Sequence, residues 1–223
     1  MRPIYLAAPI LISLFFSCEK PETDLSLTEN HKEAVLATYK CSENSSERYI
    51  PLCIGNSWSY DVEGTDILSI NCEILSDTMI NRKNYYYSFY DLPWPSNSDK
   101  KLNMTYENGR YYVYIWDRAK WMIFDEEAEI GDTWTACLYF GKTNYYTSRF
   151  TVDKKYESFE VNGKVLNNVT EMKQEFEGGD DYYSTYLGTS KYNYAKGIGL
   201  ISINHLKSNG HQINYSLTDY YVQ

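Results

Sequence analysis

Histidine is scarce in this chain, with 3 in 223 residues, and no Cys-x-x-Cys pair occurs. Structural zinc sites draw their ligands from paired cysteines and histidines, and nucleophilic catalysis needs a base held beside a serine or cysteine. A Gly-x-Ser-x-Gly nucleophile motif is missing as well. We therefore predict a protein that is not an enzyme and that has no catalytic residues, no metal and no cofactor.

Long apolar runs are also missing. The most apolar stretch, Ile4–Phe16, is shorter than the roughly 20 residues that a helix needs to span a bilayer. It follows Arg2 and leads into Phe16-Ser17-Cys18. A positive start, an apolar middle and a small residue before the cleavage point are typical of a secretory signal. The cysteine after the small residue resembles the lipobox of bacterial lipoproteins. We therefore expect residues 1–17 to be a signal peptide and Cys18 to carry acyl chains, palmitate among them.

Positive charge is in the minority, with 21 basic against 30 acidic residues and a net charge of −9. Loss of Arg2 with the signal would make the mature chain more acidic still. An acidic protein is repelled by nucleic acid and by anionic lipid headgroups. We expect no nucleic-acid partner, and contact with the membrane through the N-terminal lipid alone. The expected location is the cell envelope, with the protein anchored to the outer membrane. The periplasmic and the surface side of that membrane are both compatible with the sequence.

Five cysteines are present, and four remain if Cys18 carries lipid. An even number in an oxidising compartment favours disulfides. The preferred pairing joins Cys41 to Cys53 and Cys72 to Cys137. Free buried thiols are the alternative.

The chain changes character near residue 48. Residues 18–47 are polar and charged and are expected to form a lipidated tether. Within this tether, Ser26-Leu27-Thr28-Glu29 has the spacing of a capping box, which predicts a short helix over about 28–40. Residues 48–223 carry runs rich in Tyr, Ile, Val, Thr and Trp, broken by turn residues, which indicates a single β domain.

Three Asn-Gly pairs, at 108–109, 162–163 and 209–210, lie between such runs. Asn and Gly tolerate the positive φ angles of type I′ turns, so we predict three hairpins. Strands are expected at 57–62, 67–75, 83–90, 104–106, 111–116, 120–124, 133–140, 145–152, 159–161, 164–166, 168–176, 182–187, 201–206 and 212–217.

The strand at 111–116 is apolar on both faces, since Tyr, Val and Ile alternate there with Tyr, Tyr and Trp. Such a strand is either covered on both faces or lines a groove. The fold is therefore predicted to be all-β, a strongly curved antiparallel sheet or open barrel. A two-layer β-sandwich is the alternative.

Tyrosine is abundant, with 24 residues, and its ring suits half-buried sheet surfaces. Trp94 lies between two prolines, so we expect it on a loop and partly exposed. An aromatic platform is the candidate binding surface, formed by Trp94, Tyr90, Tyr87, Trp116 and Tyr114. The acidic clusters at 125–132 and 175–181 are interpreted as solvated loop charge, with calcium binding as the alternative.

Three motifs point to a family. Tyr49–Tyr60 (YIPLCIGNSWSY) resembles the Y-x-P-L-x-x-G-x-x-W-x-Y opening of small uncharacterised envelope lipoproteins of Bacteroidetes-type bacteria. Tyr194–Ile201 (YAKGIGLI) resembles their closing Y-A-K-G-V-G-L-V, and Glu129–Trp134 is similar to their V-G-D-T-W element. The resemblance implies a secreted β-rich domain with no established activity, similar in fold to periplasmic lipoprotein carriers. Gly197 and Gly199 are expected to mark a bulge or a close backbone approach within a strand.

The sequence thus predicts a non-enzymatic envelope lipoprotein that binds a glycan, a lipid or a protein through an aromatic concave surface. The alternative is a structural or assembly subunit of an envelope complex without a small-molecule ligand. A hydrolase that uses the acidic residues Asp180 and Asp181 is least favoured.

Overall fold

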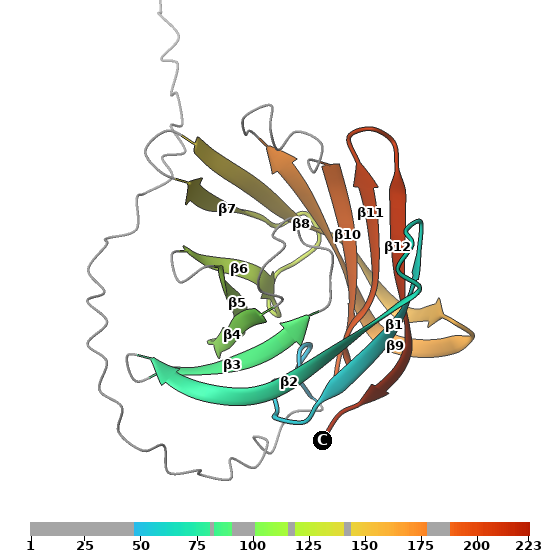
Figure 1. Ribbon diagram of the computed structural model, residues 1–223, viewed down its shortest axis with the longest axis horizontal. Coiled ribbons are helices and arrows are strands. Elements are labelled where there is room, and N and C mark those ends of the chain that lie inside the picture. The colour runs from blue at the N-terminus through green and yellow to red at the C-terminus, as the bar shows by residue number, and fades with distance from the viewer. Residues whose placement is uncertain (1–46, 81–82, 91–100, 116–118, 141–143, 178–187) are drawn as a thin grey trace, which may run out of the picture. The chain divides into compact units, whose positions relative to one another are not determined.

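Strands dominate the chain from Ser57 onward. The computed structural model describes residues 47–80, 83–90, 101–115, 119–140, 144–177 and 188–223, all within one unit of the chain, Glu33–Gln223. These residues form twelve strands (Figure 1): β1 (Ser57–Glu63), β2 (Ser69–Ile80), β3 (Lys83–Tyr90), β4 (Lys101–Glu107), β5 (Arg110–Ile115), β6 (Ala119–Asp125), β7 (Thr133–Phe140), β8 (Asn144–Val161), β9 (Lys164–Glu177), β10 (Gly188–Ala195), β11 (Gly199–Lys207) and β12 (Gln212–Tyr221).

The strands make one antiparallel sheet in the order β6-β5-β4-β3-β2-β1-β12-β11-β10-β9-β8-β7. The first and last strands, β1 and β12, pair in the middle, whereas the successive strands β6 and β7 lie at the two edges. The Trp134 indole on β7 donates to the Met122 carbonyl oxygen on β6 at 2.8 Å, so the two edges meet. The predicted curved sheet or open barrel is confirmed. The sheet is open between β6 and β7, which are not paired as neighbouring strands, and we call this boundary the β6–β7 seam.

One face of the sheet buries the apolar side chains, and we call it the inner face. Along β1, Trp58, Tyr60 and Val62 are buried and alternate with more exposed residues, the period expected of a strand covered on one side. Across the sheet, Val62 pairs with Tyr215 and Tyr215 with Ile203. Burial of each such side chain stabilises the fold by about 1.5–3 kcal/mol.

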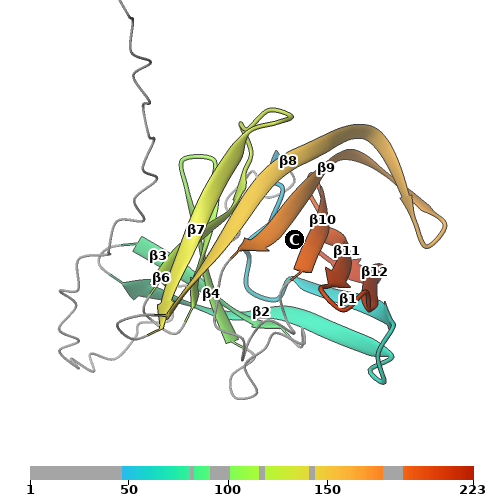
Figure 2. The ribbon, with the colours of Figure 1, turned by 90° about the horizontal axis from the view of Figure 1, so that it is seen from above.

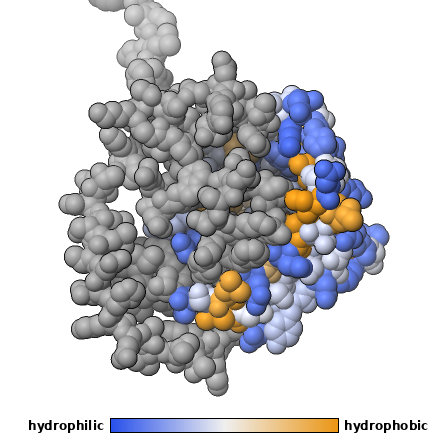
Figure 3. Space-filling model, viewed as in Figure 1, coloured by the Kyte–Doolittle hydropathy of each residue, from blue (hydrophilic) through white to orange (hydrophobic). Residues whose placement is uncertain are grey.

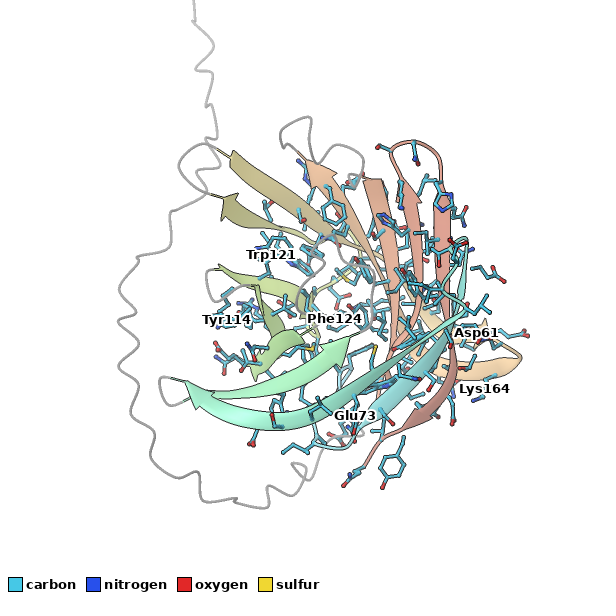
Figure 4. All side chains as sticks on the ribbon, viewed as in Figure 1. Asp61, Glu73, Tyr114, Trp121, Phe124 and Lys164 are labelled. Carbon is cyan, nitrogen blue, oxygen red and sulfur yellow. The ribbon has the colours of Figure 1, made fainter. Side chains whose placement is uncertain are left out.

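Phe124 on β6 connects the two halves of the sheet across the inner face (Figure 4). Its ring lies 4.9 Å from that of Tyr194 on β10, 4.9 Å from that of Tyr49 and 6.1 Å from that of Tyr111 on β5. Because β6 and β10 are far apart in the sheet order, this contact requires the sheet to curl back on itself.

The segment before β1 lies against both halves. The Gly197 amide donates to the Arg48 carbonyl at 2.7 Å, and the Tyr49 amide donates to the Glu126 carboxylate at 3.0 Å. Glu126 also accepts the Tyr111 hydroxyl at 2.6 Å. Burial, followed by the bond to Glu126, raises the pKa of Tyr111. Ile50 is 5% exposed, so the segment belongs to the core.

The hairpin predictions hold with one change of turn type. Asn108 and Gly109 have φ of 50° and 82°, and Asn162 and Gly163 have φ of 48° and 73°, as type I′ turns require. At the third turn Gly210 has a positive φ and Asn209 does not. The Asn209 side chain instead accepts the His211 amide at 2.9 Å, which stabilises a wider turn.

Two predicted strand breaks are absent from the sheet. The runs 145–152 and 159–161 join in β8, which has a β-bulge between Val152 and Lys154. The runs 164–166 and 168–176 join in β9, where Asn168 has a φ of 54°. The tip of this long hairpin reaches β12, where the Asn162 amide donates to the Leu217 carbonyl at 3.0 Å (Figure 2). Strand β10 was not predicted, and the expected strand 182–187 lies outside the described residues.

Gly197 lies in the turn between β10 and β11, and Gly199 is the first residue of β11. The close backbone approach predicted for these glycines is confirmed at Gly199. Their φ angles are 79° and 113°. The Trp58 indole donates to the Ile198 carbonyl at 2.6 Å, and a Cβ at position 199 would lie 3.2 Å from that indole nitrogen. Glycine at 199 therefore serves both the backbone angle and the close approach of Trp58.

The coloured part of the surface in Figure 3 is mostly hydrophilic, with small apolar patches. Leu68, 79% exposed, is among the exposed apolar residues, and scattered residues of this kind are ordinary. No helix in the described ranges is long and apolar enough to cross a membrane. The expected helix over about 28–40 lies outside those ranges.

We predict that Trp134→Phe weakens the seam. The ring can still stack on Phe150, whose centroid lies 5.9 Å away, but the bond to Met122 is lost. Urea denaturation should give a free energy of unfolding lower by about 1 kcal/mol. Hydrogen exchange should quicken at β6 and β7. Trp58→Phe, which alters the opposite pairing region, is the control and should leave exchange at β6 and β7 unchanged; equal exchange in both variants contradicts the role of the seam contact.

Candidate functional site

The predicted aromatic platform stays a prediction, and its described positions lie on both faces of the sheet. Trp94 and Trp116 lie outside the described residues. Tyr87 pairs with Asn103, which pairs with Tyr114, so positions 87 and 114 share a face. Tyr90 instead pairs with Cys72, a buried position of the inner face. Since directly paired positions share a face, positions 87 and 114 lie on the outer face and position 90 on the inner one.

The cysteine pairing is corrected in one half. Cys72 is a buried thiol on the inner face of β2, 1% exposed. Strand β7, which carries Cys137, is at a sheet edge several strands away, so the predicted Cys72–Cys137 disulfide is wrong. Cys53 is buried, and because Cys41 and Cys18 lie outside the described residues, the Cys41–Cys53 pairing and the lipidation of Cys18 stay predictions.

A row of polar side chains crosses the inner face of β8 to β11. Gln174 on β9 pairs with Ser190 on β10, and Ser190 pairs with His205 on β11. The Gln174 amide donates to Ser148 Oγ at 3.0 Å and accepts the Tyr192 hydroxyl at 2.7 Å. Ser190 Oγ lies 2.8 Å from His205 Nδ1. We call Ser148, Gln174, Ser190, Tyr192 and His205 the polar row.

The polar row is partly open to solvent although its surroundings are not. Ser148, Gln174 and Ser190 are at most 2% exposed, whereas Tyr192 and His205 are half-buried. The positions that flank them, Met172, Ile203 and Ile213, are buried. A polar group in such apolar surroundings is costly unless it is bonded. The row satisfies itself internally, and Tyr192 and His205 are its partly exposed members.

The polar row carries no net charge at neutral pH. Burial, with a smaller contribution from the nearby Lys207 charge, lowers the pKa of His205, so its ring is neutral. Burial raises the pKa of Tyr192 to about 12. It raises the pKa of Tyr215, which lies beside the row, as well. Since His205 Nδ1 faces Ser190, Nε2 is the ring's remaining hydrogen-bonding atom.

The described acidic residues and histidines do not gather into one cluster. Among the described residues no group of His, Cys, Asp and Glu is placed to hold a metal ion. In the acidic segment 125–132, Asp125 binds Arg110 and Glu129 binds Lys155, so these carboxylates have protein partners. Asp180 and Asp181 lie outside the described residues.

Sequence reasoning missed the polar row, although a signal exists. Thr170, Met172 and Gln174 are alternate positions of one strand and share its inner face. From this alternation the sequence could have indicated that the Gln174 side chain lies on the inner face. Ser148, Ser190 and His205, the other polar residues near it, come from three other strands. Only the pairing of those strands brings the five side chains together.

No family model matches the sequence, and no curated protein is similar to it. Two crystal structures are similar in fold. A candidate exported protein with a YmcC-like fold from Bacteroides fragilis has a TM-score of 0.50 and 11% identity, over 78% of this chain and 99% of that one. A candidate lipoprotein from Parabacteroides distasonis has a TM-score of 0.47 and 12% identity, with the same coverage. The first likeness is one of fold alone, an open and strongly curved antiparallel sheet.

We predict that His205 makes the fold sensitive to acid. Its folded pKa lies below the ordinary value near 6.5, so on acidification the unfolded chain takes up the proton first. Stability should therefore fall as the pH drops through about 6.5. Melting temperatures from pH 8 to pH 5 should drop less for His205→Gln than for the wild type. His211→Gln, at an exposed turn, is the control; an unchanged slope in His205→Gln refutes the assignment.

Proposed function

We propose that the mature protein is a lipid-anchored, non-enzymatic protein of the bacterial cell envelope. It binds an uncharged amphipathic molecule, lipid-like in character, on the inner face at the polar row. The observation that carries this proposal is the half-exposed pair Tyr192 and His205, neutral and bonded from behind, between buried apolar residues.

The chemistry of the row selects the ligand class. Tyr192 and His205 Nε2 can exchange hydrogen bonds with a hydroxyl, ester or amide group. Met172, Ile203 and Tyr215 are buried around the row and make its surroundings apolar. A charged headgroup would lose its hydration there without gaining a counter-charge, so an uncharged ligand is favoured.

The envelope location rests on two supports. Ser17-Cys18 after an apolar run has the form of a lipoprotein processing site. The Bacteroides fragilis protein of similar fold is described as a candidate exported protein. An outer-membrane anchor and a Cys41–Cys53 disulfide, which an oxidising compartment permits, complete the proposal.

The lipid anchor is testable in a bacterium that processes lipoproteins. Cys18→Ala should remove labelling by radioactive or alkyne-bearing palmitate and shift the protein from the membrane fraction to the soluble one. Cys72→Ala, at a buried thiol, is the control and should retain both. Palmitate labelling that survives Cys18→Ala contradicts the anchor.

The ligand is testable with the purified mature chain. We expect native mass spectrometry to reveal an uncharged lipid-like adduct, and diacylglycerol to bind more tightly than phosphatidylglycerol. Tyr192→Phe should weaken diacylglycerol binding about tenfold, because one hydrogen bond of about 1.4 kcal/mol is lost. Tyr220→Phe, on a partly exposed residue of β12, should bind like the wild type.

If wild type and Tyr192→Phe bind equally, or if no uncharged lipid binds, the inner-face proposal fails. Stable copurification with an envelope protein instead of a lipid would support the assembly subunit.

A further inference from the structure

A second polar cluster lies on the outer face, where the β8–β9 hairpin leaves the sheet. Lys191 Nζ on β10 lies 3.1 Å from Asp153 Oδ2 on β8 and 2.9 Å from Glu171 Oε1 on β9. The Tyr156 hydroxyl donates to the other Glu171 oxygen at 3.0 Å. Asp153 is the extra residue of the β8 bulge, which places its carboxylate beside Lys191. We call Asp153, Tyr156, Glu171, Lys191 and Asn193 the Lys191 cluster.

The charges of this cluster fix one another. The bond from Lys191 holds the pKa of Asp153 below its ordinary value, and the bonds to Glu171 and Asp153 raise the pKa of Lys191. The Glu171 side chain is 8% exposed, whereas those of Lys191 and Asp153 are 39% and 34% exposed. Two carboxylates face one ammonium, so the cluster is acidic overall. Its buried member is Glu171, and its solvent-exposed members are Lys191 and Asp153.

Asn193 supplies a second, independent observation. It lies directly between Glu171 and Ser202 in the sheet and is 7% exposed. Its amide nitrogen donates to Ser202 Oγ at 2.9 Å. Its Oδ1 is buried without a hydrogen-bond partner among the described residues. A buried acceptor of this kind destabilises the free protein and gains a bond when a donor reaches it.

Aromatic surface lies next to these polar groups. The rings of Tyr156 and Phe159 are 5.3 Å apart at an interplanar angle of 58°, and both are half-buried. Such rings can pack against the C–H face of a pyranose, while carboxylates accept and ammonium groups donate hydrogen bonds to its hydroxyls.

Beyond the cluster the outer face stays polar across the next strands. Ser202 pairs with Ser216 on β12, and Ser216 pairs with Asp61 on β1. The Asn204 amide donates to Asn214 Oδ1 at 2.8 Å in the neighbouring row. Strands are about 4.8 Å apart. The polar surface beyond the cluster is therefore wide enough to contact several further sugar units of a bound oligosaccharide.

We infer that the Lys191 cluster binds a neutral oligosaccharide, with one sugar ring against Tyr156 and Phe159. Vicinal hydroxyls of that ring bond Asp153 and Lys191, and a third donates to Asn193 Oδ1. This last bond requires the side chains that close Oδ1 to solvent to move on binding. The acidic balance of the cluster disfavours uronic acids and phosphorylated sugars. This site is on the face opposite the polar row and does not depend on it.

The test uses the full mature chain on an array of neutral and uronic-acid oligosaccharides, followed by calorimetry with the neutral binder. We expect neutral hexose oligomers to bind and uronic-acid oligomers not to bind. Lys191→Gln should weaken binding at least tenfold. Lys164→Gln, at the tip of the same hairpin (Figure 4), is the matched control and should bind like the wild type.

A folding defect in Lys191→Gln is separated from a binding defect by a second variant. Phe159→Ala removes the partly exposed ring without touching the ion pairs and should also lose binding, with an unchanged circular dichroism spectrum. Wild-type protein that binds no neutral oligosaccharide, or equal binding by the wild type and both variants, overturns the inference. Because lipid binding is measured with Tyr192→Phe, failure here leaves the inner-face proposal standing.

Discussion

The contact between Phe124 and Tyr194 is the packing interaction on which the rest of the structure depends. A single sheet with one apolar face and no covering helix among its described residues must bury that face against itself, so it has to curl. Phe124 on β6 and Tyr194 on β10 meet 4.9 Å apart and join the two halves. Glu126 and the segment around Tyr49 add hydrogen bonds to both halves at the same level.

The inner and outer faces of the curled sheet carry different groups of polar side chains. The inner face is crowded with rings near Phe124, yet Tyr192 and His205 remain half-exposed farther along β10 and β11. The outer face carries the Lys191 cluster, where the long hairpin departs at the Asp153 bulge. Both sites use β9 and β10, one through Gln174 and Ser190 and the other through Glu171 and Lys191. The alternation of side chains along these two strands therefore separates an uncharged site from a charged one.

Much of the fold follows from local signals. Two Asn-Gly pairs specify their type I′ turns because few other residues accept φ near 50° followed by φ near 80°. Alternation along 57–62 and the tyrosine-rich run 83–90 give β1 and β3 almost to the residue. Strand β10 was missed although Lys191 and Asn193 alternate with Tyr192 and Tyr194, a pattern typical of a half-buried strand. Lys191 and Asn193 belong to the proposed sugar site. The aromatic platform stays a prediction, because Trp94 and Trp116 lie outside the described residues. Tyr87 and Tyr90 are three positions apart on β3 and therefore lie on opposite faces by alternation alone.

The sequence by itself determined the β class, most strand positions and two of the three turn types, because period-two alternation and positive-φ residues act over a few neighbours. Only the tertiary structure decided that β1 and β12 pair, that Cys72 is a thiol apart from Cys137, and that Ser148, Gln174, Ser190 and His205 form one row. These features join residues that are between 15 and more than 150 positions apart in the sequence. Their register is fixed by the curvature of the whole sheet.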